Sequence, residues 1–385
     1  MAITDKEQGV WGTDQVYNKI MEGDIWSYES TLNSFFITGQ NEAGELGQND
    51  IANRSSPVQI PGSWSKAFRG NSKSTMGLKS DNTLWVWGRN TYGQAAQNNE
   101  TPGYSSPVQI PGTWSSAKGG AMAGGLKTDG TLWTWGFNNG GSLGQNQPGP
   151  GNSRSSPVQV PGTWSKFSSS GYSNHAIQTD GTLWAWGYNN QGQLGHNNYT
   201  QYSSPKQVPG SWDEISAGGQ SVLSVKSDNT MWSWGNNSYG QLGLNEGTGN
   251  HKNSPVQIPG TTWKKEINEY GAGTHAAAIK TDGTLWTWGR NNKGQLGHNS
   301  ESQYSSPKQV PGTIWQYVQT NGSTTLAQKT DGTIWGWGQN TDGELGLNNR
   351  TDRSSPVQIP GGYTLNNVDG TDGPGLSASV LLKLN

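Results

Sequence analysis

Short runs of alternating apolar and polar residues recur along the chain and predict short β-strands. In "TLWTWG", Leu285 and Thr287 alternate with Trp286 and Trp288, which places both tryptophans on one face because successive side chains of a strand point to opposite faces. An Asp-Gly pair separates this run from the preceding "AAAIK", as in a tight hairpin whose central residues need positive φ. "SPVQIPG" supplies another short strand with proline at its start, and the segment after its Pro-Gly turn supplies a further one. The pattern therefore predicts a unit of short antiparallel strands joined by turns.

This unit recurs seven times along the chain. Most copies carry a tryptophan pair followed by glycine, whereas in one degenerate copy Phe36 and Thr38 take the tryptophan positions. The glycines that close the motifs are spaced by 48 to 54 residues: Gly39, Gly88, Gly136, Gly187, Gly235, Gly289 and Gly338. A fixed period of this length is typical of a propeller or a solenoid. The sequence therefore predicts an all-β fold, a seven-bladed β-propeller of four-stranded antiparallel blades.

The two ends of the chain together complete one unit. C-terminal "SVLLKLN" aligns with "AAAIKTD", so that Asn385 falls where Asp282 stands, and Asn33 falls where Gly283 stands. One hairpin of the ring is therefore expected to be cut open, with residues 376–385 paired beside the strand that contains Phe35. The ring is then closed by strands from both termini, which leaves no free sheet edge. We divide the chain into an arm, residues 1–32, and a propeller, residues 33–385.

The composition limits the core and the class of partner. Only 30% of the residues are hydrophobic, whereas the chain holds 20 tryptophans, so the core must be built from large rings. We expect each tryptophan pair to fill the space between neighbouring blades; a platform for a ligand is the alternative. A net charge of −2, with scattered Lys and Arg, is not the footprint of a nucleic-acid binder. No apolar run is long enough to span a membrane, and no Sec signal is visible at the N-terminus.

The unit "TDGTLWxWGxNxxGQLGxN" followed by "SSPVQ" resembles the repeat of the regulator of chromosome condensation family. The resemblance covers about nine tenths of the chain, and it implies a seven-bladed β-propeller. The eponymous member is a nucleotide exchange factor for a small GTPase that inserts a wedge-like hairpin and binds chromatin. No repeat here exceeds its neighbours by more than a few residues, which leaves no room for such a wedge. The chain thus looks like a bacterial or viral type of member, a group that includes pure binders.

No motif points to catalysis, a metal or a cofactor. The histidines lie in different repeats without a second metal ligand at short spacing: His175, His196, His251, His275 and His298. The Asp residues of the Asp-Gly and Asp-Asn pairs stand alone at hairpin apices, so we interpret them as turn residues and not as calcium ligands. The asparagine after each Trp-x-Trp-Gly-x is expected to bind loop backbone groups. We therefore predict a protein that is not an enzyme and has no cofactor.

Variation between the repeats marks the candidate partner-binding surface. The segment between "LGxN" and "SP" changes in every copy, from "DIANRSS" to "EGTGNHKNS", as expected for loops that can evolve a surface. Cations and aromatic residues stand at the end of these loops, and side chains of these kinds are enriched at binding hot spots. The candidate partner-binding residues are Arg54, Tyr104, Arg154, Tyr202, Lys252, Tyr304 and Arg353. The alternative is that each of them packs within its own blade.

The arm lies outside the repeats. In "TDQVYNKIMEG", an apolar face of a short helix is predicted that ends near Gly23, and such a helix is marginal unless it packs on a surface. We expect a docking arm that anchors the propeller to an assembly, or an arm that folds back and plugs its own ring. The docking residues would be Trp11, Val16, Tyr17, Ile20 and Trp26.

The sequence thus predicts a non-enzymatic, protein-binding or structural propeller. Its Asn, Gly, Ser, Thr and Gln richness and low charge favour a phage-type virion structural or receptor-binding protein, with a larger assembly or a cell-surface receptor as partner. The alternatives are a cytosolic interaction scaffold or protein inhibitor and, behind these, a small-GTPase exchange factor. No signal in the sequence decides between a virion-associated and a cytoplasmic location.

Overall fold

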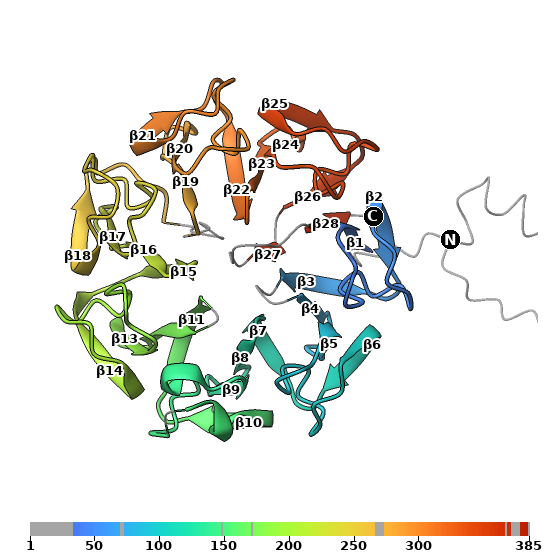
Figure 1. Cartoon of the computed structure of the whole chain (residues 1–385), viewed down its shortest axis with the longest axis vertical. Helices are drawn as coiled ribbons and strands as arrows, with labels where there is room; N and C mark the ends of the chain where they lie inside the picture. The colour runs from blue at the N-terminus through green and yellow to red at the C-terminus, as the bar shows by residue number, and fades with distance from the viewer. Residues whose placement is uncertain are drawn as a thin grey trace, which may run out of the picture.

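The strands of the computed structural model form a ring of small twisted sheets around a central axis (Figure 1). The structure describes residues 34–69, 73–147, 149–170, 172–265, 273–365, 368–370 and 378–383. The predicted arm, residues 1–32 with Trp11, Val16, Tyr17, Ile20 and Trp26, lies outside the described residues. Two 3₁₀ turns, η1 (Asn139–Gly141) and η2 (Pro150–Asn152), interrupt the described strands, and no helix in this part of the chain is long and apolar enough to cross a membrane.

Five sheets consist of four antiparallel strands each, and a sixth has four antiparallel strands with a parallel fifth strand added. Three of them are made of β1 (Ser34–Gly39), β2 (Arg54–Ile60), β26 (Tyr363–Thr364) and β28 (Ala378–Lys383); of β3 (Trp64–Arg69), β4 (Ser74–Lys79), β5 (Leu84–Arg89) and β6 (Gly103–Ile110); and of β7 (Trp114–Lys118), β8 (Met122–Lys127), β9 (Leu132–Gly136) and β10 (Arg154–Val160). The other three are made of β11 (Trp164–Ser169), β12 (Ser173–Gln178), β13 (Thr182–Gly187) and β14 (Tyr202–Ser211); of β15 (Glu214–Gly218), β16 (Ser221–Val225), β17 (Met231–Gly235) and β18 (Lys252–Ile258); and of β22 (Trp315–Asn321), β23 (Thr324–Lys329), β24 (Ile334–Gly338) and β25 (Arg353–Ile359).

The predicted seven four-stranded antiparallel blades are wrong, although the all-β propeller class is right. The described residues form six complete blades, and the remaining sheet has only β19 (His275–Ile279), β20 (Leu285–Gly289) and β21 (Tyr304–Gln309). On the inner side of β19, a single bridge joins Trp263 to Lys280. The residues that follow Lys265, 266–272, lie outside the described residues. The sheet of β3–β6 departs from the prediction too, because β27 (Val368–Gly370) adds a parallel fifth strand beside β3.

Both ends of the described chain meet in one sheet, as the split hairpin predicted. β28 runs antiparallel to β1, from Ser34 opposite Lys383 to Gly39 opposite Ala378. On its other edge β28 pairs with β26. In Figure 1 the red end of the chain accordingly lies beside its blue beginning. The closing sheet is therefore held by main-chain hydrogen bonds between residues more than three hundred positions apart.

The second tryptophan of each pair forms the core between neighbouring sheets. These rings have no exposed surface, and each indole Nε1 donates a hydrogen bond of 2.8–2.9 Å to a carbonyl of the preceding repeat: Trp87, Trp135, Trp186, Trp234, Trp288 and Trp337. In the degenerate repeat, the Thr38 hydroxyl donates to the Gly343 carbonyl instead, at 3.1 Å. The first tryptophan of each pair is only half-buried, because it lies near the hairpin end of its strand. The expectation that both rings fill the interface is therefore correct for the second ring alone.

A second set of bonds links the sheets near their outer strands. The asparagine of each "LGxN" has positive φ, and its backbone N–H donates to a carbonyl in the outer strand of the next sheet, as Asn98 does to Ser155 at 2.7 Å. The same bond from Asn348 to Ser55 joins the end of the ring to its beginning. The backbones approach so closely that a Cβ on Gly93 would lie 2.5 Å from the Ser155 Cα. These contacts fix the outer loops on a rigid ring.

Candidate functional site

Pockets between neighbouring sheets repeat one design. Three of them have volumes of about 370, 400 and 380 Å³. One wall comes from the "Gly-x-Asn" segment and the Pro-Gly turn of one repeat, and the other comes from two tryptophans and the Ser-Pro pair of the next repeat. The pockets centre on Trp212 and Trp232, on Trp164 and Trp184, and on Trp64 and Trp85. No acidic side chain is among the residues that line these three pockets.

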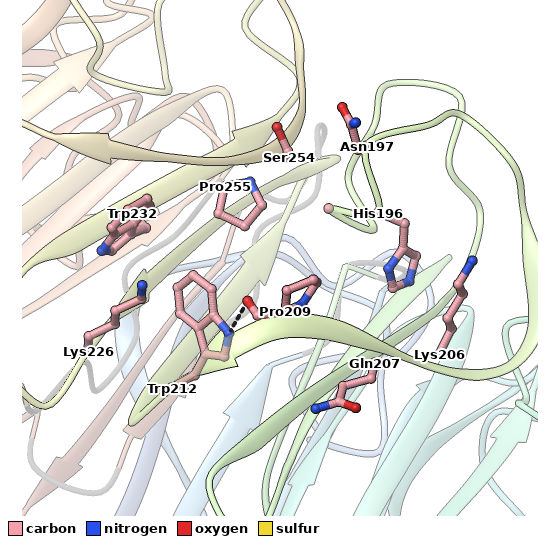
Figure 2. Close-up of a pocket in the computed structure, with 11 residues that line it drawn as sticks. His196, Asn197, Lys206, Gln207, Pro209, Trp212, Lys226, Trp232, Ser254 and Pro255 are labelled. Carbon is pink, nitrogen blue, oxygen red and sulfur yellow. Dashed lines mark hydrogen bonds between the residues drawn. The ribbon is translucent and has the colours of Figure 1, made fainter.

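A lysine lies between the two tryptophans of the first pocket (Figure 2). The Lys226 Nζ is 4.0 Å from the ring centroid of Trp232 and 4.7 Å from that of Trp212, within the range of cation–π attraction. The Trp212 Nε1 donates to the Pro209 carbonyl at 3.2 Å, which orients this ring. The Trp232 Nε1 donates to the Thr230 hydroxyl at 3.0 Å. Both rings are thus held in place around the ammonium group.

The same lysine recurs in most repeats. Lys79, Lys127, Lys280 and Lys329 lie 3.9–4.4 Å from the first tryptophan of their pair and 5.0–5.4 Å from the tryptophan after the Pro-Gly turn. In the pocket of Trp164 and Trp184, Gln178 replaces the lysine, so this pocket has the same walls without the charge. The chain therefore contains charged and neutral versions of one site. We did not predict this arrangement. The signal for it is the lysine that stands two residues before the hairpin aspartate in five repeats, at Lys79, Lys127, Lys226, Lys280 and Lys329.

The hairpin aspartates are turn residues, as predicted. Asp228 Oδ1 accepts hydrogen bonds from the backbone N–H of Thr230 at 3.0 Å and from its hydroxyl at 2.6 Å. The hydrogen bond from the Thr230 side chain is the main reason that the pKa of Asp228 lies below its usual range. The same pairs occur at Asp81, Asp129, Asp180, Asp282 and Asp331. Each of these threonines in turn holds the first tryptophan of its repeat.

Two of the candidate partner-binding tyrosines belong to three-residue clusters. Lys206 donates to the Tyr202 hydroxyl at 2.8 Å and lies over its ring at 4.2 Å, and His196 packs edge-on against the same ring at 5.2 Å. The hydrogen bond from Lys206 lowers the pKa of Tyr202, and burial lowers the pKa of His196. His298, Tyr304 and Lys308 repeat the cluster. We did not predict a role for Lys206 or Lys308. The signal for them in the sequence is "SSPKQ", which replaces "SSPVQ" or "NSPVQ" only in these two repeats.

All the candidate partner-binding residues lie at or near the start of an outer strand, and all are partly buried. Six of them bind groups of their own repeat: Arg54 with Asp50, Tyr104 with Asn99, Arg154 with Gln147, Tyr202 with Lys206, Lys252 with Glu246, and Tyr304 with Lys308. The Nε of Arg353 is buried without a hydrogen-bond partner among the described residues. Partner binding by these residues stays a prediction.

The histidines do not assemble a metal site in the described part of the chain, where no group of three or more His, Cys, Asp and Glu residues could hold an ion. His175 and His275 are buried, and burial lowers their pKa values to about 4 and about 3. The two histidines do not occupy equivalent positions. His275 pairs with Gly289, whereas the corresponding glycine, Gly187, pairs with Ser173 of β12. His175 lies two residues further along its strand, where its Nε2 contacts the Gln193 carbonyl at 2.8 Å.

Comparison with known proteins identifies the repeats. The model of the Regulator of chromosome condensation (RCC1) repeat matches residues 129–175, 180–225, 228–277, 282–324 and 331–368, and a second model of this repeat matches residues 71–94 and 212–241. Protein RCC2 homolog of Danio rerio is 50% identical over 38 residues, which are 10% of this chain and only 8% of that protein. Protein RCC2 of Homo sapiens is 47% identical over a stretch of the same length, 7% of its own length.

Solved structures with low sequence identity share the fold. Human WBSCR16 is 18% identical with a TM-score of 0.78, over 91% of this chain and 98% of that chain. Prp20p of Saccharomyces cerevisiae is 19% identical with a TM-score of 0.79, over 93% of this chain and 94% of that chain. At these identities the likeness concerns the fold alone. Because the repeat model matches more than half of its residues, the chain belongs to the regulator of chromosome condensation (RCC1) repeat family.

Proposed function

We propose that this chain is a non-enzymatic propeller that binds a protein partner through the variable loops at its outer rim. The observation that carries the proposal is the contrast between these loops and the ring. The links between sheets repeat from one sheet to the next, whereas the segments before the outer strands differ in every copy. A rigid scaffold with variable loops is a common way to build a binding surface.

A protein partner agrees with what is known of a similarly folded protein. Prp20p was characterised for its binding to Gsp1p and to histones. The exchange activity that the family resemblance implies for its eponymous member is our second candidate. We rank it lower because the repeat spacings of 48 to 54 residues leave little room for a wedge-like insertion. Accelerated nucleotide release from a small GTPase on addition of this chain would reverse that ranking.

The virion structural and receptor-binding role expected from the composition has no support in the comparisons. The assignment to a bacterial or viral type of member rests on the sequence alone. We therefore keep the proposal at the level of protein binding, with an interaction scaffold or a protein inhibitor as the simplest forms of it.

The test compares rim variants in quantitative capture of partners from cells of the source organism. Changing Tyr104, Tyr202 and Tyr304 to Ser together removes three partly exposed rings, and we expect at least a tenfold loss of the specific partner. Tyr92→Ser is the matched control, because Tyr92 is an exposed ring in the β5–β6 connection that lies before Asn98 and so outside the variable segment. Equal capture by the triple variant and the wild type, both with unchanged melting temperature, would refute binding through the rim.

A further inference from the structure

The charged pockets between the blades contain a cation that makes no side-chain hydrogen bond to the described residues. An ammonium group carries three donors. In the described part of the chain, neither Lys79 nor Lys226 has an ion pair or a side-chain hydrogen bond, and both are half-buried between two indole rings. The charge of Lys226 acts on Asp228, but the Asp228 carboxylate is already bound by Thr230. The protein thus holds a cation in a fixed place and leaves its donors free.

The walls of the pocket add apolar planes and amides. Trp232, Trp212 and Pro255 line one side, and Asn197 and Gln207 contribute side-chain amides that can donate and accept hydrogen bonds (Figure 2). A pocket of about 370 Å³ with apolar walls and a few fixed polar groups is a typical small-molecule site. Lys206 also lines this pocket, which makes it the more cationic of the described sites. Charge complementarity therefore favours an anionic ligand with an apolar face.

We propose that the lysine-containing pockets at Trp212/Trp232 and Trp64/Trp85 bind a carboxylate-bearing saccharide. The carboxylate would accept hydrogen bonds from Lys226 or Lys79, the C–H face of the sugar ring would lie on the indole and proline surfaces, and the amides would bind hydroxyl groups. The two pockets are separate, because one lies between the sheets of β2 and β3 and the other between the sheets of β14 and β15. Each can therefore bind one acidic sugar unit independently of the other. The ligand class differs from the protein partner proposed for the rim, although Lys206 and His196 of the first pocket also contact Tyr202.

The chain provides its own matched substitutions for the test. Gln178 stands at the lysine position of the neutral pocket, so Lys79→Gln and Lys226→Gln copy a residue that the fold already accepts. Gln178→Lys makes the reverse change. The probe is a trimer of galacturonic acid. Its affinity is compared with that of its fully methyl-esterified form, which lacks the charge, and with that of a glutamate oligopeptide of equal charge, which lacks the sugar. Binding is measured by calorimetry and by tryptophan fluorescence on the full chain, after the melting temperature of each variant has been checked.

We expect the acidic trimer to bind at least tenfold more tightly than its ester. The K79Q/K226Q double variant should lose about tenfold or more of that affinity, because a charge-assisted hydrogen bond is removed at each site. Gln178→Lys should raise the number of bound trimers per chain. Equal binding of trimer and ester, an unchanged affinity in the folded double variant, or equal or tighter binding of the glutamate oligopeptide at these lysines would each overturn the proposal.

Discussion

Repeats of the propeller differ from one another at single buried positions. At the position before "LG", or before "AA" in one repeat, four repeats have glutamine, at Gln94, Gln193, Gln241 and Gln295, and the others have Glu45, Ser142 and Glu344. Glu344 takes this place in the last full repeat, where it is almost completely buried. Its Oε2 accepts a hydrogen bond from the backbone of Asp342, but its Oε1 is buried without a partner among the described residues. Burial is the main cause of its raised pKa.

Glu344→Gln should stabilise the protein at neutral pH. Because the folded pKa of Glu344 is raised, its charged form opposes folding at pH 7, and this cost falls as the pH drops towards the folded pKa. We expect a gain of about 1 kcal/mol, measured by thermal unfolding, which shrinks on acidification. Glu301→Gln, in an exposed loop, is the control. A lower melting temperature of E344Q at pH 7 would show that the carboxylate is needed.

The buried histidines predict a loss of stability in mild acid. The pKa values of His175 and His275 are about 4 and about 3 in the folded chain and near 6.5 when unfolded. As the pH falls, the unfolded state therefore binds protons before the folded state does. The free energy of unfolding is highest above about pH 6.5 and decreases below it. At pH 4 the decrease is on the order of 3 kcal/mol per histidine. Urea unfolding at several pH values between about 7 and 4 measures how the free energy of unfolding changes with pH.

To test the role of the two histidines, each is replaced by the residue that stands at the same strand position in another repeat. His275→Thr copies Thr324, which pairs with Gly338 as His275 pairs with Gly289, and His175→Leu copies Leu223 in β16. The double variant should show a flatter pH dependence than the wild type. The same slope in both proteins would mean that other groups cause the acid sensitivity.

At the scale of the element, the two tryptophans of one strand have different roles. Trp186 is completely buried and donates to the Ser142 carbonyl of the preceding sheet at 2.9 Å, whereas Trp184 is half-buried and donates to Thr182 of its own hairpin at 3.0 Å. Alternation placed both rings on one face, but it could not tell which ring reaches the neighbouring sheet. That difference depends on how the sheets pack along the strand.

Trp186→Phe should therefore lower the stability of the propeller more than Trp184→Phe does. The first change removes buried ring atoms and one of the two donors to the Ser142 carbonyl, which Asn174 also binds at 2.7 Å. We expect it to cost roughly 2–4 kcal/mol. The second change should cost less than about 1 kcal/mol. Chemical unfolding of both variants measures the difference, and equal losses would contradict the assigned roles.

Much of each repeat could be predicted from its sequence, because tight turns and alternation are local signals. The Asp-Thr-Trp chain of hydrogen bonds and the hairpins follow from residues close together in sequence. The asparagine after each Trp-x-Trp-Gly-x also behaves as predicted: Asn189 is buried, and its side chain binds the backbone of Leu194, Asn198 and Thr200. The Lys–Trp pockets could not be predicted in this way, since they need residues from two neighbouring sheets.

At the scale of the whole molecule, the ring depends on contacts between distant parts of the chain. The repeat period predicted identical sheets, but among the described residues one sheet has three strands and another gains a parallel fifth strand, β27 beside β3. Neither feature belongs to the repeat, so the period alone could not predict them. The pairing of β28 with β1 was predictable because the two ends match two halves of the same hairpin.

Removal of residues 381–385 should destabilise the whole ring. β28 lies between β1 and β26, so the deletion shortens two strand pairings and exposes sheet edges. We expect a loss of several kcal/mol, measured by thermal unfolding followed by circular dichroism. Removal of residues 384–385 alone is the control for chain length. An unchanged melting temperature after the longer deletion would show that the closure contributes little.

Hydrogen–deuterium exchange of the chain, alone and with its captured partner, tests the proposed function most directly. If the rim binds the partner, amides of the variable loops, such as residues 47–54, 146–154 and 245–252, should become protected in the complex. The Asp-Gly hairpins and the inner strands β7, β11 and β15 should exchange as in the free chain. Protection confined to those hairpins and inner strands, with the variable loops unchanged, would contradict binding through the rim.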